Sequence, residues 1–455
     1  MDLFERLKDA AEEIKKAEFV RVVSHLDADG ISAAAIALSA LTRAGKKLHI
    51  SIEKQLTPEL IEDLKKEDPG LFLFTDLGAG YIELLEELSG KSKVIICDHH
   101  IPSKETPEGM IHINPVLEGM GEDEISGAGV TYFLAKEIDS KNKDLIFLAI
   151  IGAIGDIQDE DWKMKGLNQN IVEEAVKLGY IKKENGIRLF GRMNRPVHKA
   201  LEYSTNPYIP GVSGDESAAI QFLSELGIEL KNENGWRTLN DLTDEETRKL
   251  ASAIICERIR ENETNPEEIF GEIYTLSIGN EILDAREFAT FLNACGRMGQ
   301  PPVGILISLG AESTEKMNGI LTGYRKMITK YMKWIKERKE NVYETEKAYY
   351  INAGNEIHEN FIGTITSICQ KSSILNSGKL IFGMAETDDG KIKVSVRAPD
   401  ELVQKGINLK EMMSKLTKDY GGYGGGHAIA AGAFIPKGRE KEFIASCENY
   451  LKEKL

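Results

Sequence analysis

Three side chains that can bind a metal ion lie within five residues of one another, in the segment His25-Leu26-Asp27-Ala28-Asp29-Gly30. The segment follows an apolar, β-branched run, residues 19–24, which predicts a buried parallel strand. Two aspartates at this spacing repel each other unless a cation lies between them. Gly30 permits a close approach of the backbone, and the helix expected after it offers its N-terminus to an anion. Alone, the loop fits a turn or a helix cap about as well as a metal site.

Three more apolar runs end in carboxylates or imidazoles. The residues at these ends are Asp76 after 71–75, Asp98-His99-His100 after 94–97, and Asp156 after the buried helical segment 151–155. Carboxylates and imidazoles without cysteine suit Mn²⁺ or a similar divalent ion and disfavour a structural zinc site. Two histidines and four aspartates exceed what one octahedral ion needs once water and substrate are bound. The count therefore favours two ions joined by a bridging carboxylate.

The elements that must position these residues alternate between strand-like and helix-like segments over residues 1–160. The expected strands are 19–24, 48–52, 71–75 and 94–97, and the expected helices are 31–43, 58–66 and 81–88. This alternation predicts an α/β fold with a doubly wound, mainly parallel sheet. Ligands of such sheets bind beyond the carboxyl ends of the strands, where His25, Asp76 and Asp98 all fall.

The rest of the chain divides by its pattern into three parts. Residues 161–310 read as a mainly helical middle region that completes or lies beside the first domain, 311–346 as one long connecting helix, and 347–455 as a smaller α/β domain. Within this last part we expect a strand at 348–352, a helix at 359–370, a hairpin of 379–386 with 391–397, a helix at 400–418, a glycine-rich run at 421–427 and a strand at 428–435. We expect a cleft between the first domain and the last.

Composition limits the class of protein. With 455 residues, 42% hydrophobic and 29% charged, the chain reads as a globular protein of two or three domains. A net charge of -16 excludes a general nucleic-acid coat protein, so any nucleic-acid site must be confined. The longest apolar run, 145–154, is too short to cross a bilayer, and no signal-peptide pattern is visible. Five scattered cysteines without a CxxC pair indicate a reducing compartment, so we expect a cytoplasmic protein without a membrane partner.

These motifs, in this order, resemble the DHH phosphoesterase superfamily, which is named for Asp98-His99-His100. The C-terminal domain resembles the DHH-associated domain (DHHA1), whose hallmark is the Gly-Gly-Gly-His run, here residues 424–427. The chain length and the segment 284–297 resemble the RecJ-like single-strand exonucleases, especially the archaeal type.

The resemblance implies a role for each matching residue. It places one ion on His25, Asp27 and Asp76, and a second on Asp29, Asp76, His99 and Asp156, with Asp76 bridging. It places His100 at the scissile phosphate and Asp98 behind a histidine that it orients. In the C-terminal domain it implies that a substrate phosphate is held by Arg397, His427 and the amides of Gly424, Gly425 and Gly426. The implied cofactors are two divalent cations, Mn²⁺ before Mg²⁺.

The expected reaction is hydrolysis of phosphodiester bonds by a hydroxide that two metal ions activate. The leading expectation is an exonuclease that releases mononucleotides from single-stranded DNA or RNA ends, in DNA replication, DNA repair or RNA turnover. An alternative within the same chemistry is an enzyme for oligoribonucleotides, cyclic dinucleotides or nucleoside bisphosphates. An alternative of another class is a scaffold whose middle region binds a replisome (GINS-like) protein. The remaining histidines are expected to be structural or surface residues; they are His49, His112, His198 and His358.

Overall fold

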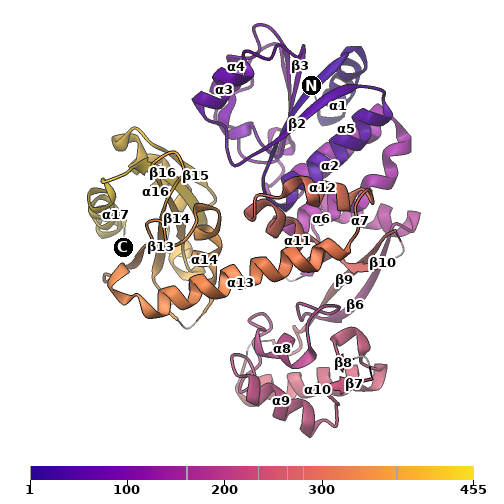
Figure 1. Cartoon of the computed structure of the whole chain (residues 1–455), viewed down its shortest axis with the longest axis vertical. Helices are drawn as coiled ribbons and strands as arrows, with labels where there is room; N and C mark the ends of the chain where they lie inside the picture. Colours follow the sequence, from indigo (N-terminus) through magenta and orange to yellow (C-terminus); the bar gives the residue numbers. More distant parts are fainter. Residues whose placement is uncertain are drawn as a thin grey trace. The chain divides into compact units, whose positions relative to one another are not determined.

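The computed structural model describes residues 2–159, 162–233, 235–263, 265–279, 281–372, 374–375 and 378–454. The chain forms two compact units, Met1–Ile320 and Leu321–Leu455 (Figure 1). Among the described residues, none of the helices combines the length and the apolar character that crossing a membrane requires.

The first unit is built on a five-stranded parallel sheet in the order β2-β1-β3-β4-β5. Its strands are β1 (Phe19–His25), β2 (Lys47–Glu53), β3 (Leu71–Thr75), β4 (Lys93–Cys97) and β5 (Met110–Ile113). Every residue of β3 is buried, as expected for a strand that is covered on both faces. The predicted fold class, α/β with a doubly wound parallel sheet, is confirmed. The short edge strand β5 was not predicted.

Helices cover both faces of this sheet. One face carries α1 (Leu3–Lys16), α2 (Ala28–Arg43) and α5 (Gly127–Ile138); α1 and α2 both contact α5, and all three contact strands. On the other face α3 (Pro58–Leu64) and α4 (Ile82–Glu86) pack on a cluster that includes Phe72, Phe74 and Ile96. Helix α4 is shorter than the expected helix 81–88, because Tyr81 belongs to a 3₁₀ turn (Ala79–Tyr81) and α4 ends at Glu86. The apolar helix α6 (Ile146–Gly155) packs against α2 and α5.

The middle region is helical, but it also contains a three-stranded antiparallel sheet in the order β10-β9-β6. The strands are β6 (Ile181–Ile187), β9 (Phe270–Ile278) and β10 (Glu281–Asp284). Helix α7 (Gly166–Leu178) precedes β6, and α11 (Ala285–Arg297) and α12 (Pro301–Ser308) follow β10. Between β6 and β9 the chain forms a subdomain with its own buried cluster; its elements are α8 (Val197–Glu202), α9 (Glu216–Glu225), β7 (Lys231–Asn232), β8 (Gly235–Trp236) and α10 (Asp244–Arg260).

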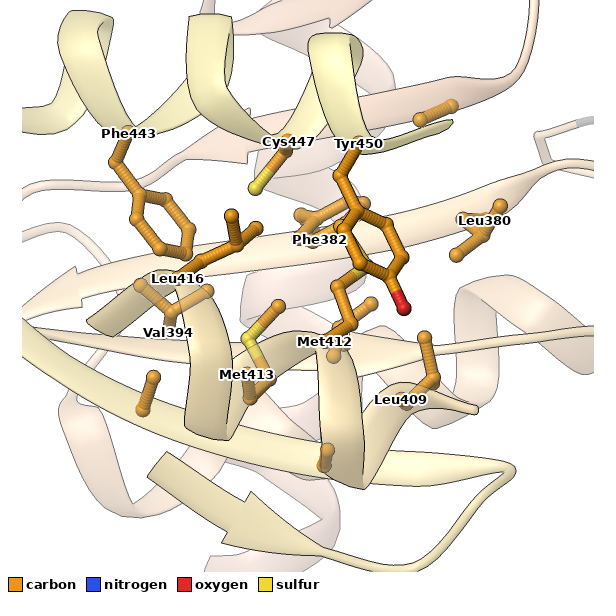
Figure 2. Close-up of a cluster of buried hydrophobic side chains, with 14 of the residues drawn as sticks. Leu380, Phe382, Val394, Leu409, Met412, Met413, Leu416, Phe443, Cys447 and Tyr450 are labelled. Atoms are coloured by element: carbon orange, nitrogen blue, oxygen red, sulfur yellow. The ribbon is translucent and has the colours of Figure 1, made fainter. Parts of the chain in front are cut away.

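The second unit contains a six-stranded mixed sheet in the order β11-β12-β13-β14-β16-β15. The strands are β11 (Val342–Glu344), β12 (Ala348–Asn352), β13 (Leu380–Glu386), β14 (Lys391–Arg397), β15 (Tyr423–Gly426) and β16 (Ala430–Pro436). Its helices are α14 (Glu359–Lys371), α15 (Asp400–Gln404), α16 (Leu409–Leu416) and α17 (Glu440–Lys454). Figure 2 shows how Met412 and Met413 of α16 and Phe443 of α17 fill the core over Phe382 and Val394.

Two expectations for the C-terminal part were wrong in detail. The connecting helix α13 (Glu315–Glu337) ends well before residue 346, because a 3₁₀ turn and β11 follow it. The expected helix 400–418 is two helices, interrupted near Gly406, whose φ of +98° no helical residue adopts. Within the glycine-rich run, Tyr423–Gly426 forms the edge strand β15.

Candidate metal centre

The expected metal-binding residues meet at the carboxyl ends of three neighbouring strands. His25 is the last residue of β1, Asp76 follows β3, and His99 follows β4 by two positions. Asp27 caps α2, accepting a hydrogen bond from Gly30 N at 3.0 Å. Asp156 comes from elsewhere, at the C-terminal end of α6. Because parallel strands end at the same edge, three separate loops deliver their side chains to one place.

Asp76 lies between the two histidines. His25 Nδ1 is 3.5 Å from Asp76 Oδ2 and 3.0 Å from Asp27 Oδ2. On the other side, His99 Nε2 is 3.5 Å from Asp76 Oδ1, 3.5 Å from Asp156 Oδ2 and 3.9 Å from Asp29 Oδ2. Ligand atoms of His25, Asp27 and Asp76 lie within 4.8 Å of one another, as do those of Asp29, His99 and Asp156. The two oxygens of Asp76 thus face two separate groups of possible ligands.

The side chains fit divalent cations. Both carboxylate oxygens of Asp76 and the Nε2 of His99 are buried and form no hydrogen bond within the described part of the chain. An unsatisfied buried carboxylate is costly, and one partner that would satisfy it is a metal ion. Asp76 also has a φ of +53°, a strained conformation for a residue other than glycine that is typical of functional sites. Carboxylates with imidazole nitrogens are ligands suited to Mn²⁺ or Mg²⁺.

The crowding of carboxylates shifts the pKa values of the cluster. Burial and the neighbouring Asp76 raise the pKa of Asp29 well above its usual value, and burial likewise raises the pKa of Asp156. Burial alone would lower the pKa of His99, but Asp76 and Asp156 outweigh it and raise this pKa. The same balance, with Asp27 and Asp76, raises the pKa of His25. The shifts of these four groups favour their protonated forms, whereas His25 outweighs burial at Asp27 and lowers the pKa of that carboxyl group.

Asp29 is held by the start of α5. Its Oδ2 accepts a hydrogen bond from Gly127 N at 2.6 Å and its Oδ1 one from Ala128 N at 2.9 Å. A Cβ on Gly127 would lie 2.5 Å from the Cβ of Asp76, and a Cβ on Gly152 would overlap Asp29 Oδ1. The sequence interpretation missed both glycines, although Gly152 lies within the apolar run that leads to Asp156.

Asp98 positions His100 by hydrogen bonding. Its Oδ1 accepts from His100 Nδ1 at 2.7 Å, and its Oδ2 accepts from Ala79 N at 2.8 Å. Burial opposes ionisation of Asp98, but the charges of His100 and His99 and these hydrogen bonds lower its pKa. Because Nδ1 bonds Asp98, the other ring nitrogen of His100, Nε2, faces away from Asp98. This geometry suits the orienting role expected for Asp98.

Two side chains that the sequence interpretation did not identify orient the ligands. Gln158 Nε2 donates to Asp156 Oδ2 at 2.8 Å and to the carbonyl of Glu122 at 3.1 Å. His99 Nδ1 lies 2.7 Å from that same carbonyl, to which it donates, so the His99 Nε2 faces the carboxylates. Asn293 of α11 accepts from Ala28 N at 3.1 Å and donates to the carbonyl that precedes Asp156 at 3.4 Å. No local pattern marks either residue.

The expected phosphate-binding residues of the second unit lie on β14 and β15, the two neighbours of β16, and directly after β15. Arg397, the last residue of β14, is paired with Ala430 of β16, and His427 N donates to the carbonyl of the same Ala430 at 2.8 Å. Because hydrogen-bonded pairs alternate along an antiparallel ladder, the amides of Gly424 and Gly426 point away from β16, whereas that of Gly425 points toward it. Arg397 itself donates from Nε to Ser367 Oγ at 2.8 Å. Arg397 and His427 thus flank Ala430 of β16, whereas the amides of Gly424 and Gly426 point away from β16 and therefore away from Arg397.

Three domain families match the chain. The DHH family N-terminal domain matches residues 19–153, the DHH-CID domain residues 189–269, and the DHHA1 domain residues 348–453. The DHH-CID match corresponds to the subdomain between β6 and β9.

Two curated proteins are similar in sequence. An uncharacterized protein of Methanocaldococcus jannaschii is 34% identical over 445 residues, 96% of this chain and 94% of that protein. The single-stranded-DNA-specific exonuclease RecJ of Thermus thermophilus is 28% identical over 238 residues, 48% of this chain but only 35% of that protein.

Solved structures share the fold. Crystal structures of RecJ from Thermus thermophilus with Mn²⁺ and with Mg²⁺ align with TM-scores of 0.58 and 0.53, at 18% and 17% identity; they cover 99% of this chain and 55% and 52% of theirs. CDC45 from Entamoeba histolytica aligns with a TM-score of 0.65 at 13% identity, over 98% of this chain and 97% of that one. The domain matches, the sequence relatives and the shared fold lead to one assignment: the chain is a RecJ-like member of the DHH superfamily.

Proposed function

We propose that this protein is a metal-dependent exonuclease that hydrolyses single-stranded DNA or RNA to mononucleotides. The observation that carries the proposal is the position of Asp76, whose two buried oxygens face His25 and His99 at 3.5 Å on opposite sides. Such a carboxylate suits a bridge between two divalent cations, Mn²⁺ or Mg²⁺. When bound, the cations would supply an activated water and neutralise the charge that develops on the phosphate.

The other residues of the site position groups around the scissile phosphate. His25, Asp27 and Asp76 would hold one cation, and Asp29, Asp76, His99 and Asp156 the other. Asp98 fixes the His100 ring through Nδ1 at 2.7 Å, so that Nε2 can donate to a phosphate oxygen or protonate the leaving oxygen. The raised pKa of His100, which Asp98 maintains against burial, favours the protonated ring that this role requires.

Substrate selection falls to the DHHA1 domain in this proposal. Arg397 and His427 would offer a guanidinium and an imidazole to a terminal phosphate of the strand, whereas the outward amides of Gly424 and Gly426 lie on the far side of β16 from Arg397. Gly425, which was expected to contribute its amide, directs it into the ladder with β16 instead.

Two alternatives remain. Hydrolysis of oligoribonucleotides, cyclic dinucleotides or nucleoside bisphosphates would use the same metal centre. A scaffold function, in which the DHH-CID domain binds a replisome protein, is compatible with the fold shared with CDC45. The exonuclease is favoured over a pure scaffold because all six expected metal ligands are present and converge.

The test is release of mononucleotides from 5′- and 3′-labelled single strands of DNA and RNA, with Mn²⁺ or Mg²⁺. The variant is Asp76→Asn, which keeps the shape and tolerates the positive φ. The matched control is Asp68→Asn, because Asp68 is an exposed aspartate whose φ is also positive, at +43°. Asp76→Asn should lose activity by at least about 100-fold, and Asp68→Asn should keep it. An Asp76→Asn protein that retains wild-type activity refutes the bridging role, and cleavage of dinucleotides alone refutes the exonuclease.

A further inference from the structure

A pocket of about 360 Å³ opens beside the metal centre, within the first unit. Its wall combines aromatic and guanidinium side chains, namely Trp162, Arg188, Phe190, Arg195, Tyr203 and Arg286. These come from three separate segments: the chain after α6, the start of the DHH-CID domain, and α11. A volume of this size is that of a small-ligand site.

The pocket is cationic in an acidic protein. Three arginines line it, and Asp159 is the carboxylate among its lining residues, whereas the whole chain carries a net charge of -16. Arg286 is buried, forms an ion pair with Asp159 and donates to the Glu272 carbonyl at 3.0 Å. Arg188 donates to Asn206 Oδ1 at 3.0 Å. Arg195 lines the pocket and is half-buried. A local excess of positive charge selects an anionic ligand.

The guanidinium groups are stacked on aromatic rings. The Arg286 guanidinium lies 4.0 Å from the centre of the Trp162 ring. The Arg195 guanidinium lies 5.2 Å from the rings of both Phe190 and Tyr203, and the Tyr203 side chain is 56% exposed. Planar cations held on aromatic faces are the surfaces on which nucleobases stack in single-strand binding proteins.

The pocket also reaches the metal-binding loops. Asn293 lines it and bonds both the amide of Ala28 and the carbonyl of Gly155, the neighbours of Asp27 and Asp156. Ile157, which directly follows Asp156, lines the pocket with its side chain 75% exposed and its φ at +61°. A β-branched residue in this conformation is strained, and strain of this kind concentrates at ligand sites.

From these features we propose that the pocket binds one nucleotide, with its phosphate on Arg195 and its base against the exposed face of Tyr203 and the Trp162–Arg286 stack. Two sources share this chemistry: a nucleotide of the strand being degraded, or a free nucleoside monophosphate. The first source rests on the proposed function, and the second does not.

The experiment measures binding to the full chain in EDTA, so that neither metal binding nor hydrolysis contributes. AMP, adenosine and inorganic phosphate are titrated by calorimetry, and a fluorescently labelled 12-nucleotide oligoadenylate by anisotropy. The variants are Arg195→Ala and Tyr203→Ala. Their matched controls are Arg260→Ala and Tyr208→Ala, because both residues are exposed on the same DHH-CID domain and neither lines the pocket.

We expect Arg195→Ala and Tyr203→Ala each to weaken binding at least about tenfold, while the controls match the wild type. If the two variants bind AMP more weakly than the wild type, and the wild type binds AMP more tightly than adenosine or phosphate, the ligand is a free nucleotide. If only the 12-nucleotide strand is affected, the ligand is a nucleotide of the strand. If neither ligand responds to the two variants, or adenosine binds as well as AMP, the proposal is wrong. Because no turnover is measured, an inactive metal centre would leave this result unchanged.

Discussion

Gly127 donates its backbone N–H to the carboxylate of Asp29, 2.6 Å away and 98 residues earlier in the chain. The start of α5 therefore holds one of the proposed metal ligands. The same glycine leaves room for Asp76, because a Cβ at position 127 would lie 2.5 Å from the Cβ of Asp76. The positions of two carboxylates of the cluster, those of Asp29 and Asp76, thus depend on one helix terminus. A side chain added at this terminus or opposite it should displace these carboxylates.

Gly152→Ala is expected to displace Asp29 from the side of α6, opposite the start of α5. The new methyl group would overlap Asp29 Oδ1 and lie 2.6 Å from the Cβ of Ala128. Because α6 is tightly packed on α2 and α5, we expect a loss of about 1–3 kcal/mol in the free energy of unfolding and weaker Mn²⁺ binding. Denaturant unfolding and calorimetric Mn²⁺ titration measure the two effects.

The matched control is Gly319→Ala, which adds the same methyl group inside α13, where a Cβ meets nothing within 4 Å. It should stabilise the protein by up to about 1 kcal/mol, since alanine favours helix. Equal effects of the two substitutions would contradict the crowding at Asp29.

Addition of Mn²⁺ is expected to stabilise the folded protein. A ligand that binds only the folded state adds about 2.7 kcal/mol at a hundred times its Kd, which thermal unfolding with and without EDTA detects. The gain should disappear in Asp76→Asn, whose side chain no longer offers two anionic oxygens, and persist in Asp68→Asn. A full gain in Asp76→Asn would show that the cations bind elsewhere.

The parallel sheet and the meeting of His25, Asp76 and His99 at one edge follow from local features. Each of these residues lies at the end of a short, mostly apolar run or one or two positions after it, and the carboxyl ends of parallel strands coincide. Strand β6 escaped prediction because its central residues, Lys182 to Gly186, are polar or glycine and are exposed or half-buried. A strand without an apolar face gives no period-two signal.

The residues that support the centre could not be predicted from the sequence, because their contacts are distant in the chain. Asn293 bonds the amide of Ala28, which lies 265 residues earlier, and Gln158 bonds the carbonyl of Glu122, 36 residues earlier. Each is a single polar residue in an unremarkable local context. Only the packing of α11 and α6 onto α2 brings such residues to the site.

Asp98→Asn is expected to change the pH dependence of hydrolysis as well as its rate. The Asp98 carboxylate raises the pKa of His100 against the effect of burial, so the amide should let that pKa fall. If protonated His100 assists catalysis, activity is lost as pH rises through this pKa, and the variant should lose activity at a lower pH. We also expect kcat to fall about 10- to 100-fold. Asp63→Asn, an exposed aspartate, is the control; an unshifted profile in Asp98→Asn would contradict the role of His100 as an acid.

Protonation of the buried His112 should lower the free energy of unfolding in mild acid. Burial lowers the pKa of His112 to about 4, and its ring contacts Thr106 and Asn114 in the neutral form. On acidification the unfolded chain therefore protonates at His112 before the folded protein does. The contribution of neutral His112 to the free energy of unfolding, about 3 kcal/mol in total, is complete above about pH 6.5 and is lost as pH falls toward 4. In His112→Asn, unfolding curves between about pH 7 and pH 4.5 should show a smaller loss. The exposed His49, changed to Asn, should leave the slope unaltered.

Ile157→Gly is expected to raise the free energy of unfolding while weakening the binding of a ligand to the pocket. The wild-type isoleucine is 75% exposed with a φ of +61°, so its side chain gains little from burial while its backbone is strained. Glycine relieves that strain, and we expect the free energy of unfolding to rise by about 1 kcal/mol. Ile259→Gly is the matched control: this isoleucine is 57% exposed but lies within α10, where glycine should cost about 1 kcal/mol. If Ile157 lies at the mouth of a nucleotide pocket, the more stable variant should also bind its ligand more weakly. A stabilised variant with unchanged affinity would mean that the strain serves the metal ligand Asp156 alone.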